Sequence, residues 1–125
     1  MSREWQLFYG EILHHSKKIL KYSEGLNFGE IFADQILVDA ILWNILVIGE
    51  AANQIPNDIR TELPDVPWRN IISMRNQVVH VYFGLNNNIL WSVIKTHLPQ
   101  LISQLEQFKR DHAELFHDDR FGNIT

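Results

Sequence analysis

Apolar side chains recur at helical spacing along most of this chain, and no segment shows the period-two alternation of a half-buried β-strand. The first predicted helix covers about residues 2–22 and is loosely amphipathic. After a break at Gly25, Asn27 and Glu30 have the spacing of a capping box, which predicts that a second helix begins near Phe28 and continues to about residue 54. This second helix is apolar on nearly all sides, so we expect it to be buried within the fold or by a partner subunit.

Prolines divide the middle of the chain and mark the start of the next helix. Pro56 and Pro64 leave room for one short turn of helix around Ile59. Asp65 is a suitable N-cap for a helix that opens at Pro67 and runs to about residue 82.

The last predicted helix follows Gly84, which is expected to end the preceding one. Asn86 is the expected cap of this helix, and Pro99 should kink or restart it. We expect the tail after about residue 112 to fray. The pattern as a whole predicts an all-α, up-and-down bundle of about five helices with short connections.

Composition and charge narrow the class of protein. The 125 residues are 46% hydrophobic and 21% charged, typical of a globular chain, and we expect one domain over residues 1–125. A net charge of −4 argues against a broad basic surface for duplex DNA or an anionic membrane. The absence of cysteine excludes a disulfide framework, a thiolate nucleophile and a cysteine metal site. The most apolar stretch, residues 36–49, is shorter than the roughly 20 residues of a membrane span, and the first residues lack a secretory signal pattern, so we expect a cytoplasmic protein without a membrane partner.

Charged and polar residues interrupt the apolar face of the helix predicted over residues 67–82. Arg75 stands in the middle of that face, where an unpaired charge is costly, so it requires a carboxylate, a bound anion or a polar cleft. Asn76 and His80 lie next to that face one turn apart, and Tyr82 follows them. Each of these residues alone is ordinarily structural: an arginine paired with an acid, a surface histidine, a packing tyrosine. Their combination within eight residues favours a functional site.

The segment Arg75-Asn76-Gln77-Val78-Val79-His80-Val81-Tyr82 resembles the Arg-x4-His-x-Tyr motif of HEPN-domain ribonuclease toxins of the HepT type. The resemblance extends over about residues 25–105. Its other matching parts are Asp39-Ala40, Asn44-Ile45-Leu46, Ile48-Gly49-Glu50-Ala51-Ala52, Met74, Phe83-Gly84, Trp91, Leu98-Pro99 and Leu101. At residues 86–88 three asparagines stand where family members often have acids, a departure that concerns a helix start and not the chemistry.

The resemblance implies a homodimeric helical bundle whose motif lines a cleft at the dimer interface. It implies the toxin of a type VII-like toxin–antitoxin pair, which cleaves RNA without a metal or another cofactor. It also implies a partner, a small nucleotidyltransferase antitoxin of the MntA kind, which neutralises the toxin by attaching AMP to the motif tyrosine, Tyr82.

The residues themselves suit metal-independent cleavage of RNA. His80, whose ordinary pKa is about 6.5, is the natural base for a ribose 2′-hydroxyl, and Arg75 can hold phosphate oxygens with its planar guanidinium. Asn76 can orient His80 or donate to the phosphate, and attack by the 2′-oxygen would leave a 2′,3′-cyclic phosphate. On one straight helix Arg75 and His80 point about 140° apart, so we expect a two-fold dimer that supplies two of each to one cleft.

The remaining expectations concern a neighbouring carboxylate, a metal and competing functions. Glu50 is the expected partner of Arg75 in the free protein, against the alternative of a solvated carboxylate at a helix end. His112 and the tail residues 117–119 have a loosely metal-like spacing, but we expect no metal site. Two other functions stay open at this point: a non-catalytic HEPN module that binds a nucleotide or a nucleotidyltransferase, and a purely structural helical dimer.

Overall fold

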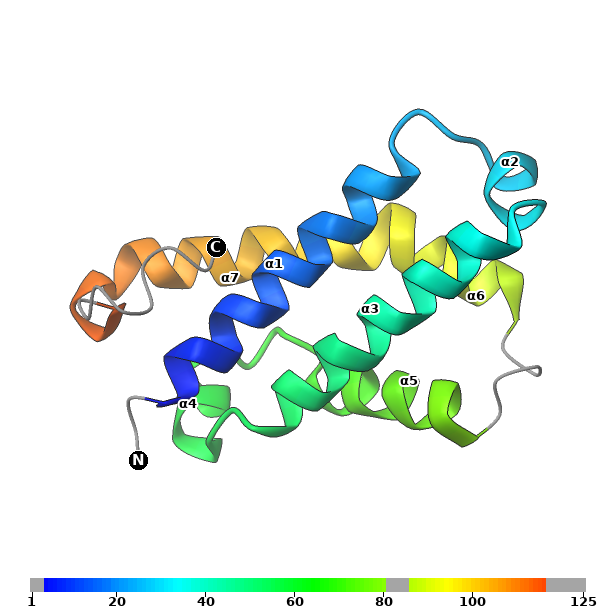
Figure 1. Cartoon of the computed structure of the whole chain (residues 1–125). Helices are drawn as coiled ribbons and strands as arrows, with labels where there is room; N and C mark the ends of the chain where they lie inside the picture. The colour runs from blue at the N-terminus through cyan, green and yellow to red at the C-terminus, as the bar shows by residue number, and fades with distance from the viewer. Residues whose placement is uncertain (1–3, 81–85, 117–125) are drawn as a thin grey trace.

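The computed structural model describes residues 4–80 and 86–116, and for His80 it describes the backbone alone. These two stretches are mostly helical and contain no β-strand. Successive long helices run in opposite directions, which confirms the predicted all-α, up-and-down bundle (Figure 1).

The bundle is organised around the central helix α3 (Gln35–Asn53). Helices α1 (Trp5–Ser23) and α5 (Trp68–His80) both pack against α3, and α7 (Leu98–Asp111) packs across α1 (Figure 1). Their facing side chains form one core, because each long helix turns an apolar stripe toward its neighbours. The largest fully buried side chains are Tyr9, Ile12, Leu13, Ile19, Ile31, Ile41, Leu90, Ile94 and Leu105.

Short helical segments connect the long helices or follow the last of them. They are α2 (Phe28–Phe32), α4 (Asn57–Glu62), α6 (Asn87–Ser92), the π-helical segment η3 (Val93–His97) and the 3₁₀ turn η4 (Ala113–Phe116). The short helix expected around Ile59 is therefore present as α4, and α6, η3 and α7 together form the last predicted helix.

The predicted second helix is divided into two. Asn27 and Glu30 form the expected capping box at the start of α2, with the Glu30 N–H donating to the Asn27 Oδ1 at 2.8 Å. The helix then stops at Ala33, and extended Asp34 caps α3 by accepting a hydrogen bond from the Leu37 N–H at 3.1 Å. The expectation of one continuous helix over residues 28–54 is wrong, because Asp34 begins a helix of its own.

The last predicted helix changes its hydrogen-bond pattern near Pro99. Asn86 caps α6 as predicted, accepting from the Asn88 N–H at 2.6 Å. In η3 the Leu98 N–H donates to the Val93 carbonyl, five residues back, instead of four. Proline cannot donate to the carbonyl four residues before it and its ring collides with that carbonyl, so the wider π turn absorbs the misfit.

The residues directly after α7 pack instead of fraying. Phe116 in η4 places its ring 5.3 Å from the ring of Trp5 and 4.9 Å from that of Tyr9. The Gln6 amide of α1 donates to the Leu115 carbonyl at 2.8 Å. The frayed tail expected from residue 112 is therefore not found over residues 113–116, while residues 117–125 lie outside the described residues.

Helix α3 is long and apolar enough to cross a membrane if length and composition alone are considered. It is also the helix on which both α1 and α5 pack, and its inner side chains belong to the core. The helix therefore has the position of a core helix in this bundle. Its outer face is different, because Ile36 is 83% exposed and Trp43 is 62% exposed. Of the two predicted alternatives for this helix, burial within the fold or burial by a partner subunit, the fold of one chain therefore does not bury it completely.

Candidate ribonuclease site

Arg75 lies at a close approach of α5 to α3. Opposite it on α3 is Gly49, and a Cβ atom at Gly49 would overlap the Cβ of Arg75 and lie 2.7 Å from its Cγ. Only glycine permits this approach, because the space that another side chain would need is filled by Arg75. The Gly49-Glu50 segment therefore positions the middle of α5.

The guanidinium of Arg75 is held by Glu50 and Asn76. Its Nε donates to the Glu50 Oε2 at 2.5 Å, and its Nη2 forms an ion pair with the same oxygen. Its Nη1 donates to the Asn76 Oδ1 at 2.6 Å. The expected contact between Arg75 and Glu50 is thus present. These bonds leave N–H groups on both Nη atoms available to an anion, since an arginine carries five donors.

The environment of Arg75 is more open than the sequence pattern predicts. Its side chain is 30% exposed and that of Glu50 is 47% exposed, so neither charge is buried. Val79, an apolar residue one turn after Arg75 on α5, is 48% exposed. The inner face of α5 is formed by Trp68 and Val78, with Ile71 and Met74 partly buried. Arg75 is partly buried on the same face, but its guanidinium and the ion pair lie at the rim of the α3–α5 contact, where Glu50 supplies the carboxylate that the pattern requires.

The other motif residues are described only in part. Asn76 is exposed, and its amide oxygen accepts from Arg75, which leaves its amide NH₂ free to donate to a substrate. Position 80 lies about 1.4 turns beyond position 75 on α5, about 7.5 Å along the helix axis and about 140° around it. The side chain of His80 and all of Tyr82 lie outside the described residues.

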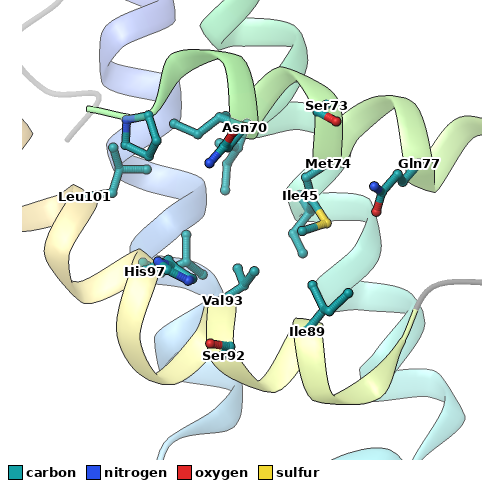
Figure 2. A pocket seen from close by; sticks show the side chains of 14 residues that line it. Ile45, Asn70, Ser73, Met74, Gln77, Ile89, Ser92, Val93, His97 and Leu101 are labelled. Atoms are coloured by element: carbon teal, nitrogen blue, oxygen red, sulfur yellow. The ribbon is translucent and has the colours of Figure 1, made fainter. Parts of the chain in front are cut away.

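Two hollows flank α5. One is an apolar groove of about 560 Å³ between α5 and the α6–α7 segment, with the side chains of Ile45, Met74, Ile89 and Val93 turned toward it (Figure 2). The other, the α4–α5 depression, has a volume of about 630 Å³. Its lining residues are Asn57, Arg60, Thr61, Pro64, Trp68, Arg69, Ile72, Ser73 and Asn76. The depression thus includes the candidate site residue Asn76, whereas the described lining of the apolar groove includes Gln77 of the motif segment but no candidate site residue.

Two histidines of the described stretches, His15 and His112, contact nearby protein groups. His112 is stacked on the Phe108 ring, and its Nδ1 lies 3.1 Å from the Phe108 carbonyl oxygen. His15 Nδ1 lies 2.6 Å from the Oδ1 of Asn44, a buried polar residue of α3. Over residues 4–80 and 86–116, no three side chains of the metal-binding types come together, and residues 117–119 lie outside this part of the chain.

Comparison with known proteins confirms the family that the sequence resembles. A family model described as Ribonuclease HepT-like matches residues 12–108. A protein of Thermococcus cleftensis named "Probable ribonuclease HepT" is 28% identical over 110 residues, which cover 88% of this chain and all of that protein. A Caldanaerobacter subterraneus protein named "Putative RNase TTE0752" is 31% identical over 96 residues, or 77% of this chain and 86% of the relative.

A further relative, "Putative RNase MJ0127" of Methanocaldococcus jannaschii, is 29% identical over 109 residues, which cover 87% of this chain and 90% of that protein. No solved structure matches the chain at a significant level. The family match includes α3, the Gly49-Glu50 segment and the whole of α5, so it contains every described residue of the site. The chain belongs to the HepT-like ribonuclease family.

Proposed function

We propose that this protein is a metal-independent endoribonuclease whose catalytic residues are Arg75 and His80. The observation that carries the proposal is the fixed guanidinium of Arg75, tied to Glu50 and Asn76 one turn before position 80, in a chain of a ribonuclease family. An arginine held in this way is preorganised for the charge that develops on a phosphate.

The reaction follows from the chemistry of these two residue types. His80 takes the proton of a ribose 2′-hydroxyl, and the 2′-oxygen forms a bond to the adjacent phosphorus. The bond from phosphorus to the 5′-oxygen breaks, and a protonated histidine returns a proton to that oxygen. The products are a 2′,3′-cyclic phosphate and a 5′-hydroxyl. Arg75 stabilises the added negative charge on the phosphate oxygens, with Asn76 as a further donor.

A homodimer completes this site. On one helix Arg75 and His80 diverge by about 140°, so one chain does not direct both at a single phosphate. Two chains related by a two-fold axis bring two arginines and two histidines to one cleft, where one histidine acts as base and the other as acid. The exposed Ile36 and Trp43 of α3 supply the apolar surface that such a contact buries, and the same face of α3 leads to Glu50 beside Arg75.

We further propose that the protein is the toxin of a cytoplasmic toxin–antitoxin pair. Its partner is a small nucleotidyltransferase that transfers AMP from ATP to the Tyr82 oxygen and releases pyrophosphate. The added group brings bulk and negative charge next to the substrate site, and both oppose the binding of RNA phosphate to Arg75. Tyr82→Phe should therefore stay active in the presence of the nucleotidyltransferase and ATP, conditions under which the unmodified protein gains AMP mass and loses activity.

The direct test is cleavage of cellular RNA by the purified protein in the presence of EDTA. His80→Ala and Arg75→Ala are each expected to lose at least 100-fold in rate, the order of magnitude of one general base or one charge-stabilising donor. Both should keep the α-helical circular dichroism of the unmodified protein. Full activity of His80→Ala would contradict the assignment. Binding of a nucleotide or of the nucleotidyltransferase without any cleavage would favour the non-catalytic HEPN module.

A further inference from the structure

The α4–α5 depression is lined by positive charge, although the protein as a whole is negatively charged. The chain as a whole carries a net charge of −4. Among the described residues, the lining of the depression nevertheless contains two arginines, Arg60 and Arg69, and no carboxylate. Its other polar lining residues are hydroxyl and amide side chains, which can all donate hydrogen bonds. A hollow of this composition suits an anion.

The depression continues along α5 toward the catalytic motif. Arg69, Ser73 and Asn76 are spaced by four and three residues, so they follow one face of the helix. Position 80 comes four residues later on the same face. From position 69 to position 80 the helix rises about 16 Å, a length that a short run of nucleotides can span.

The two arginines have different roles. Arg60 is held in place: its Nε donates to the Ile55 carbonyl at 2.9 Å, its Nη2 donates to the Ala52 carbonyl at 3.0 Å, and its guanidinium lies 6.0 Å from the centre of the Trp68 ring. It thereby satisfies the carbonyls at the end of α3 and adds a fixed positive charge to the wall.

Arg69 is exposed in the first turn of α5 and makes no ion pair with a carboxylate of residues 4–80 or 86–116. Its guanidinium is therefore free to bind a ligand. At the other end of the depression, Asn76 has its amide oxygen bonded to Arg75 and presents its NH₂ group. The hollow thus has a free cation at one end and the motif at the other.

We propose that the α4–α5 depression binds a backbone phosphate of the RNA strand next to the phosphate that is cleaved, with Arg69 as its principal ligand. This inference rests on the proposed ribonuclease site at Arg75 and His80. A planar guanidinium binds phosphate oxygens in pairs, and Arg69 lies on the face of α5 that carries Asn76 and position 80, so it directs the strand toward position 80. Arg69 contributes to substrate binding and not to the bond-breaking step.

The test compares two substrates that differ in their number of phosphates. A dinucleotide has only the phosphate that is cleaved, whereas a longer oligonucleotide also has its neighbours. Arg69→Gln should leave kcat/KM for the dinucleotide unchanged and lower it about fivefold for the oligonucleotide at 0.1 M salt, the effect of one lost phosphate contact. Arg110→Gln, which removes an exposed arginine of α7 that does not line the depression, should change neither. An equal loss on both substrates would overturn the inference, because Arg69 would then act on catalysis or folding.

Binding without cleavage separates this inference from the proposed function. In the His80→Ala background, fluorescence anisotropy with a single-stranded RNA should give a plot of log Kd against log salt whose slope falls by about 0.7 when Arg69 is replaced by Gln. An unchanged slope and affinity would overturn the phosphate site even if the protein cleaves RNA. A lower slope would support the site even if the protein does not cleave RNA, an outcome that contradicts the proposed function alone.

Discussion

At Gly49 the backbone of α3 comes so close to Arg75 that no methyl group fits between them. This single contact sets the distance between the two helices that carry the site residues. It also brings the next residue, Glu50, within reach of the guanidinium. The structure thereby gives a physical reason for a glycine and a glutamate at adjacent positions in the middle of the chain.

Gly49→Ala is expected to lower both stability and activity. The new Cβ would collide with the Cβ of Arg75, and neither atom belongs to the flexible end of a side chain, so α3 and α5 must move apart. Overpacking of this kind costs about 1–3 kcal/mol, which outweighs the roughly 1 kcal/mol that alanine gains over glycine within a helix. Thermal unfolding and the rate of RNA cleavage measure the two effects.

The matched control is Gly29→Ala in α2. A Cβ at Gly29 would meet only the Asn27 Oδ1, at the ordinary contact distance of 3.6 Å. The variant should be as stable as the unmodified protein or slightly more stable, with unchanged activity. If Gly49→Ala behaved in the same way, the close approach of α3 and α5 would not be a constraint on this fold.

Sequence reasoning reached some of these residues and missed others for identifiable reasons. The pairing of Arg75 with Glu50 was predictable, because a cation within an apolar pattern requires a partner and the family motif supplied one. The partial exposure of the Arg75 side chain was not predictable, because apolar periodicity does not show how far the contact between two helices extends. Periodicity gives no reason to single out Arg69, since an exposed arginine resembles any other solvated residue. Its four–three–four spacing with Ser73, Asn76 and His80 was the available signal.

Among the helices, capping residues were better predictors of boundaries than apolar periodicity. Asn27 and Asn86 begin helices as predicted, because a side-chain oxygen satisfies backbone N–H groups that have no partner within the helix. Asp34 acts in the same way, but it lies within a segment whose apolar pattern continues across the break. The unbroken pattern concealed a change of direction between α2 and α3. An irregularity near Pro99 was predictable from the proline. That it takes the form of a π turn was not predictable from the apolar pattern.

Asp34→Ala tests whether the cap sets the start of α3. The Leu37 N–H would lose its acceptor, so the free energy of unfolding should fall by about 1 kcal/mol and the melting temperature by roughly 3–5 °C. Asp34→Asn keeps an oxygen that can accept this hydrogen bond and should retain most of the stability. Circular dichroism during heating measures both variants. Equal losses in the two would attribute the effect to charge and not to capping.

For the whole molecule, the exposed face of α3 is the feature that one chain does not explain. Ile36 and Trp43 lie on this face, and Val79 of α5 is a further exposed apolar side chain. Large side chains of this kind, gathered on one face, are typical of an interface. A homodimer that covers them would place the Arg75–Glu50 pairs of both chains near the contact, because Glu50 continues the outer face of α3.

Trp43→Glu is therefore expected to give a folded monomer. The change adds a charge to the centre of the proposed interface but leaves the core of each chain untouched, since Trp43 is mostly exposed. Sedimentation at micromolar concentration should show a dimer for the unmodified protein and a monomer for the variant, with the loss of RNA cleavage in the variant. Leu7→Glu, which places the same charge at an exposed apolar position of α1, should remain dimeric. A monomeric Trp43→Glu protein that cleaves RNA at the normal rate would contradict the composite site.

Mixed dimers test the composite site more directly. Arg75→Ala and His80→Ala are each inactive in the proposed mechanism, and a dimer of one with the other retains one arginine and one histidine on different chains. If the two residues act together across the two-fold axis, unfolding and refolding an equal mixture should restore activity. Half of the dimers would be mixed, and each would regain one arginine–histidine pair but only one of the two histidines that serve as base and acid. The expected rate is therefore clearly above that of either variant alone and below a quarter of the normal rate. If each chain instead uses its own arginine with its own histidine, no dimer in the mixture contains a complete pair and the rate stays at that of the separate variants. The divergence of positions 75 and 80 around α5 favours the first outcome.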